Sequence, residues 1–147
     1  MENEDPLAWW QHMHGASSHF PIALLLVAFL VDLGATILRR EQWRLISFFC
    51  LIVGTLGLIP SLISGLAGGN GWFGVVWANA AYSEKMPQHR QIALIASALA
   101  FVVMFWRVIR RERLRGGEWA MYLVALFITC ALIGYTGFLG GYVGHGY

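Results

Sequence analysis

The chain has 147 residues, of which 58% are hydrophobic and only 12% are charged, with a formal net charge of +2 and a mean hydropathy of +0.60. Soluble domains carry about 25% charged residues. The composition therefore excludes a soluble domain and indicates a membrane protein, for which no nucleic-acid partner is expected.

The first ten residues, MENEDPLAWW, are acidic and contain no basic n-region. They are therefore not expected to be a cleaved signal peptide. Pro6, Trp9 and Trp10 predict a short segment that lies on the membrane interface ahead of the first helix.

Four apolar runs follow, and each is near the roughly 20 residues that a helix needs to cross a bilayer. None alternates as barrel strands do, and only helices or closed barrels satisfy the backbone inside a bilayer. Residues 1–147 are therefore expected to form a single transmembrane domain, an all-α membrane four-helix bundle. The runs are Phe20–Leu38, Leu45–Ala67, Ile92–Trp106 and Trp119–Tyr142, which predict helices at about 19–38, 44–67, 88–110 and 118–142 and a loop at 68–88.

Arginines indicate which ends of the helices face the cytoplasm. Most of the ten Lys and Arg residues follow the first and third helices: Arg39, Arg40, Arg44, Arg107, Arg110, Arg111, Arg113 and Arg115. By the positive-inside rule both short loops are cytoplasmic. A multi-pass inner-membrane protein is expected, with both termini and the loop 68–88 outside, in the periplasm.

All five histidines then fall on the outer side. His12, His14 and His19 precede the first predicted helix, His89 opens the third, and His145 follows the fourth. This asymmetry makes the outer end the candidate functional site.

The two halves of the chain resemble each other. The segments HFPIAL at 19–24 and HRQIAL at 89–94 share H-x-x-I-A-L, and each helix runs on to an Arg pair. SGLAGG at 64–69 and TGFLGG at 136–141 also match in their small and apolar residues. The pattern predicts one helical hairpin duplicated at a spacing of about 70 residues, with His19 and His89 in equivalent positions.

Two imidazoles that converge across a bundle leave room for one metal ion, as in a bis-histidine haem. A bare ion usually needs more ligands. His19 and His89 are therefore the expected metal ligands, and small residues on the third and fourth helices are expected to make space for a flat macrocycle. The expected lining residues are Ala93, Ala96, Ala100, Ser97, Gly134 and Gly141.

Other interpretations stay open. Ala and Gly stripes in membrane helices usually serve helix packing, which favours a cofactor-free structural or assembly subunit. His12, Met13, His14 and His19 offer ligands for copper or zinc outside the cytoplasm, and a single His also suits a chlorophyll. Asp32 lies inside the first span. Two roles stay open for it, namely proton transfer and a structural ion pair with an arginine.

Several segments resemble a widespread bacterial family of four-helix membrane proteins of unknown function, DUF2231. They are HGASSHFPIALL, the histidine that opens the third helix, and the closing GFLGGYVGHGY. The resemblance covers nearly the whole chain from residue 12 and implies the fold and four histidines, His14, His19, His89 and His145. Gly15 departs from the proline that many relatives carry there. The family implies no activity.

The expected function is a haem-b-binding membrane subunit that transfers electrons at the outer face. It is expected beside a larger partner, such as a periplasmic cytochrome or a respiratory or photosynthetic complex. His14 and His145 are expected to bind a second haem, or to hydrogen-bond haem propionates or a quinone. No nucleophile–base pair or phosphate loop is recognisable, which favours a non-catalytic accessory subunit over an enzyme.

Overall fold

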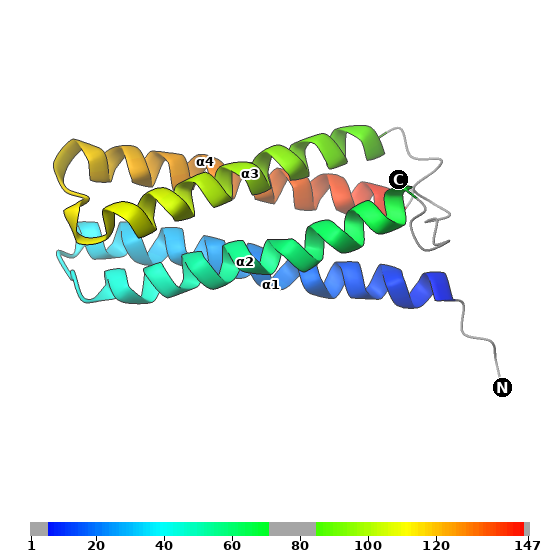
Figure 1. The fold of residues 1–147 in the computed structure, drawn as a ribbon, viewed down its shortest axis with the longest axis horizontal. Helices are drawn as coiled ribbons and strands as arrows, with labels where there is room; N and C mark the ends of the chain where they lie inside the picture. The colour runs from blue at the N-terminus through cyan, green and yellow to red at the C-terminus, as the bar shows by residue number, and fades with distance from the viewer. Residues whose placement is uncertain (1–5, 71–84, 146–147) are drawn as a thin grey trace.

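The structure, a computed structural model, describes the backbone of residues 6–70 and 85–145 and the side chains of residues 13–66, 85–111 and 113–142. Within these ranges the chain is helical and contains no strand (Figure 1). The helices are α1 (Pro6–Ile37), α2 (Trp43–Asn70), α3 (Met86–Arg110), a short 3₁₀ turn η3 (Arg111–Arg113) and α4 (Gly116–His145).

All four α-helices are long and apolar enough to cross a membrane, over Met13–Ile37, Trp43–Leu66, Met86–Arg110 and Gly116–Tyr142. Large apolar side chains are exposed on their outer faces, Ile37 at 68% and Ile109 at 75% among them. Such faces require lipid as their solvent. The prediction of an all-α membrane bundle is confirmed.

The main departure from expectation is the start of α1, which begins at Pro6 instead of near residue 19. The expected boundary placed Pro21 in the first turn, but Pro21 lies inside the helix. Its ring is buried against α2, where a side chain on Gly57 would place its Cβ 3.3 Å from the Pro21 Cβ. This glycine lets the proline ring pack closely on α2. Because α1 continues through Pro21, the segment containing His12 and His14 is helical.

The helices pack as two hairpins side by side. α1 packs mainly on α2 and α3 mainly on α4, and the hairpins meet through α1 with α4 and α2 with α3. The two short connections lie at one end of the bundle, and the start of α1 and the end of α4 lie at the other (Figure 1). The arginine-rich connections therefore share one end, as expected. Which side of the membrane this end faces stays a prediction.

The two hairpins bury the same positions, with a constant spacing of 75 residues. Within the spans, a residue and its counterpart 75 positions later usually share the same degree of burial. The pairs in which both residues are buried include Pro21 and Ala96, Leu25 and Ala100, Ala28 and Val103, Asp32 and Arg107, Ser47 and Tyr122, Leu51 and Leu126, and Leu58 and Ile133. The duplication is therefore supported, but the expected spacing of about 70 residues is wrong. His89 corresponds to His14, not to His19.

Candidate functional site

His14 lies at the terminal end of the bundle and binds its hairpin partner α2. Its Nδ1 is 2.8 Å from the Ser64 Oγ, and its ring is within hydrogen-bonding reach of the Ser61 carbonyl. Ser64 itself donates to the Ser61 carbonyl at 3.0 Å. The flat ring lies against Gly65, where an added Cβ would be 3.0 Å from the His14 Cε1.

His89 repeats this arrangement in the second hairpin. Its Nδ1 is 3.0 Å from the Thr136 carbonyl oxygen of α4. Its ring lies against Gly140, where an added Cβ would be 3.2 Å from the His89 Cε1. The same spacing of 75 residues relates the histidines 14 and 89, the carbonyls 61 and 136, and the glycines 65 and 140. The site is thus duplicated together with the fold.

The hydrogen-bond acceptor of His89 determines which nitrogen of its imidazole carries the proton. A carbonyl oxygen only accepts, so the Nδ1 of His89 donates to Thr136. The His89 ring therefore carries its lone pair on Nε2. This is the orientation that a hydrogen-bonded histidine presents to a metal. The His14 Nδ1 and the Ser64 Oγ share a hydrogen bond in which the tautomer decides the donor.

His14 and His89 stand on α1 and α3, the first helix of each hairpin. Both are partly buried. They are related by the duplication, and each packs on the second helix of its own hairpin.

His19 does not share this arrangement, and the expected pairing of His19 with His89 stays a prediction that none of the described contacts supports. Its side chain is exposed and its Nδ1 contacts the Gly15 carbonyl oxygen of its own helix. Its counterpart 75 residues later is Leu94, which is exposed as well. Five residues separate His19 from His14, which is about 140° around a helix at 100° per residue. The two histidines therefore point to different sides of α1.

The residues expected to line a cofactor cavity have mixed positions. Ala96 and Ala100 are 1% and 0% exposed and belong to the hydrophobic core. The expected cavity is therefore closed at their level, because neighbouring side chains fill it. Ala93 is partly buried and Gly141 is exposed, and the role of all these residues as cofactor contacts stays a prediction. The side chains of His12 and His145 lie outside the described residues.

A second polar cluster lies at the arginine-rich end and joins all four helices. Asp32 of α1 is 0% exposed and accepts a hydrogen bond from the Tyr122 hydroxyl of α4 at 2.8 Å. Its other carboxylate oxygen is 3.8 Å from an Nη of Arg107 on α3. Ser47 of α2 is buried beside them and donates to the Ala28 carbonyl. Asp32 therefore has a structural pairing, and Arg107 provides it instead of the arginines that follow α1.

Aromatic rings complete this cluster. The guanidinium carbons of Arg44 and Arg107 lie 4.1 and 4.6 Å from the centroid of the Trp119 ring. The Trp119 indole nitrogen donates to the Thr36 hydroxyl at 2.9 Å. Both arginines are thus held over aromatic faces, which attract cations.

Sequence reasoning named His14 as a candidate but missed its correspondence with His89, and it missed the contacts of Arg107 and Tyr122 with Asp32. One signal was available for His14 and Arg107. The positions 14, 21, 25, 28 and 32 have the same spacings as 89, 96, 100, 103 and 107. In both helices this set of inward-facing residues begins with a histidine. It ends with Asp32 in α1 and with Arg107 in α3, which carry opposite charges.

Comparisons with known proteins agree on the class of protein. A family model described as "Predicted membrane protein (DUF2231)" matches residues 11–147. No curated protein and no solved structure matches the chain. Among the described residues, no group of three or more His, Cys, Asp or Glu side chains is placed to hold a metal ion.

Proposed function

The chain belongs to the DUF2231 family of predicted membrane proteins, and we propose that it is a haem-b-binding subunit with His14 and His89 as the axial ligands. The observation that carries the proposal is the duplicated histidine site. Each ring is held at Nδ1 by its own hairpin, and Nε2 is the nitrogen that we assign to the iron. Such orientation by an outer partner is typical of metal-bound histidines.

The number of ligands favours a haem over a bare ion. Two imidazoles complete the coordination of an iron that a macrocycle already holds, whereas zinc or copper usually takes three or four protein ligands. The core beneath the histidines, at Ala96 and Ala100, sets the inner limit of the site. When bound, haem b would supply one-electron redox chemistry, and the chain's own residues would position it and restrict solvent.

The location of the histidines determines what the protein does with electrons. All described histidines lie at the end of the bundle that carries the chain termini, and the arginine-rich end has none. Charge asymmetry favours an orientation in which the terminal end lies outside the cytoplasm. The protein therefore exchanges electrons at the periplasmic face with a larger electron-transfer partner, and does not carry them across the membrane by itself.

Haem content after purification with haem supplied during expression tests this proposal. Wild type and His19→Ala retain haem, because His19 points away from the site, whereas His14→Ala and His89→Ala lose most of it. His89→Met provides a matched rescue, since a methionine ligand retains haem and raises its reduction potential. Equal haem loss in His19→Ala and His14→Ala contradicts the ligand assignment.

A second candidate is supported by the same bonds. Each histidine fastens the two helices of its own hairpin, His14 to Ser64 and His89 to Thr136. In a cofactor-free assembly subunit these contacts serve only to hold the hairpins together. That function predicts a wild type without haem whose unfolding temperature falls in His14→Ala and His89→Ala.

A further inference from the structure

A cationic cavity lies at the arginine-rich end of the bundle, opposite the histidines. It has a volume of about 410 Å³ and lies between α2, the end of α3 and the connection to α4. Its polar lining consists of Arg44, Arg107, Arg111, Arg115 and Glu41. Four guanidinium groups therefore face a single carboxylate.

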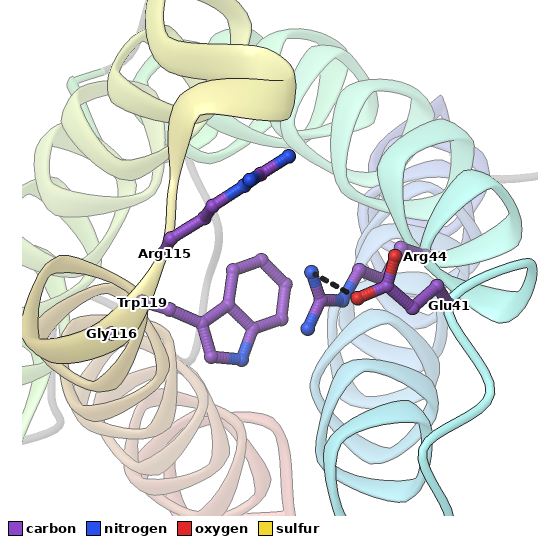
Figure 2. Close-up of a pocket in the computed structure, with 5 residues that line it drawn as sticks. All are labelled: Glu41, Arg44, Arg115, Gly116 and Trp119. Atoms are coloured by element: carbon purple, nitrogen blue, oxygen red, sulfur yellow. Dashed lines mark ion pairs between the residues drawn. The ribbon is translucent and has the colours of Figure 1, made fainter.

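A smaller cavity of about 380 Å³ adjoins it and shares Glu41, Arg44 and Arg115. Figure 2 shows the Trp119 indole between Arg44 and Arg115, with Glu41 beside Arg44. The Glu41 carboxylate is 81% exposed and 3.8 Å from the Arg44 guanidinium. This acid neutralises little of the positive charge, since exposed pairs at that distance interact weakly.

The innermost arginine has hydrogen-bonding capacity to spare. Arg107 is 5% exposed, and its Nε has no hydrogen-bond partner, as is also true of the Arg44 Nε. The nearest carboxylate oxygen to Arg107 is 3.8 Å away, too far for a hydrogen bond. A buried donor without an acceptor costs about 1–3 kcal/mol, and an anion oxygen in the cavity would remove that cost.

The rest of the lining is apolar and lies at the edge of the membrane spans. Leu45, Phe48 and Leu114 line the same cavity, and the Arg111 guanidinium carbon is 5.4 Å from the centroid of the Phe48 ring. The span in α2 begins at Trp43 and that in α3 ends at Arg110. The cavity therefore lies where lipid headgroups meet acyl chains.

We propose that this cavity binds the phosphate headgroup of an anionic phospholipid. The arginines bind the phosphate oxygens, and the apolar wall contacts the glycerol and the first methylene groups. Basic pockets between transmembrane helices suit such headgroups, and each arginine near an anionic lipid adds to the attraction. A free phosphate ion would make no use of Leu45 and Phe48.

Native mass spectrometry of the full chain, released from micelles with equal phosphatidylglycerol and phosphatidylcholine, tests the proposal. Each arginine beside an anionic headgroup is expected to raise the affinity for that lipid about fivefold. Arg111 and Arg115 alone therefore make the wild type retain phosphatidylglycerol at least about 25-fold more than phosphatidylcholine. Arg111→Gln and Arg115→Gln each lower this ratio about fivefold, and the double variant lowers it about 25-fold. Both arginines are exposed, so their replacement leaves the core unchanged.

Arg113→Gln is the matched control, because Arg113 is exposed in the same connection but does not line the cavity. It should keep the wild-type ratio, and excess inorganic phosphate should not displace the lipid. Equal retention of the two lipids overturns the proposal, as does an Arg113→Gln loss equal to that of Arg111→Gln. Displacement by inorganic phosphate also overturns it and identifies a soluble-anion site.

Discussion

Asp32 and Arg107 occupy the same position in the two hairpins and pair with each other in the interior, with 3.8 Å between the carboxylate oxygen and the guanidinium nitrogen. Both side chains are more than nine-tenths buried. The duplication thus places opposite charges where the two hairpins meet. A buried pair of this kind leaves a costly unpaired charge when one partner is removed.

Asp32→Ala is therefore expected to destabilise the protein by about 3–5 kcal/mol, because Arg107 is left uncompensated. Unfolding in mixed detergent micelles measures the change. The double variant Asp32→Leu with Arg107→Met should recover most of the loss. The control Glu41→Gln removes an exposed pair and should cost no more than about 1 kcal/mol. A cost for Asp32→Ala as small as that of the control would contradict the pairing.

The glycines beneath the histidines provide a second prediction. Gly65→Ala and Gly140→Ala each place a Cβ within 3.0–3.2 Å of an imidazole carbon. Each is expected to displace its histidine and to destabilise its hairpin by about 1–3 kcal/mol, the usual cost of overpacking. Thermal unfolding and haem content together measure the effect.

Gly134→Ala is the matched control on α4, because an added Cβ there meets no atom within 4 Å. It should be neutral or slightly stabilising, since alanine favours the helix. Equal changes in unfolding temperature and haem content for Gly134→Ala and Gly140→Ala would contradict a contribution of the close contact between His89 and Gly140.

Topology provides a third prediction. With the arginine-rich connections inside, a cysteine introduced by Arg113→Cys should react with a membrane-impermeant maleimide only after the cells are permeabilised. The wild type controls for the native cysteines, of which Cys130 is buried and Cys50 partly so. Labelling of Arg113→Cys in intact cells would reverse the orientation and place the histidine site in the cytoplasm.

The number of helices and their spans could be predicted from sequence because the bilayer fixes both length and composition. The register of the duplication could not, because I-A-L is a common apolar triplet that matches by chance. The inward position of His14 depends on α1 continuing through Pro21, whose ring packs on Gly57 of α2. Likewise, tertiary packing, not separation along α1, pairs Asp32 with Arg107 instead of Arg39.

The central claim is that His14 and His89 form one axial ligand pair, and low-temperature EPR of the oxidised, purified protein tests it most directly. Two imidazole ligands make a ferric haem six-coordinate and low-spin. The wild type and His19→Ala should therefore give a low-spin signal that His14→Ala and His89→Ala lose. A protein that takes up no haem when haem is supplied, or a wild type with a high-spin, five-coordinate signal, would contradict the paired-ligand account.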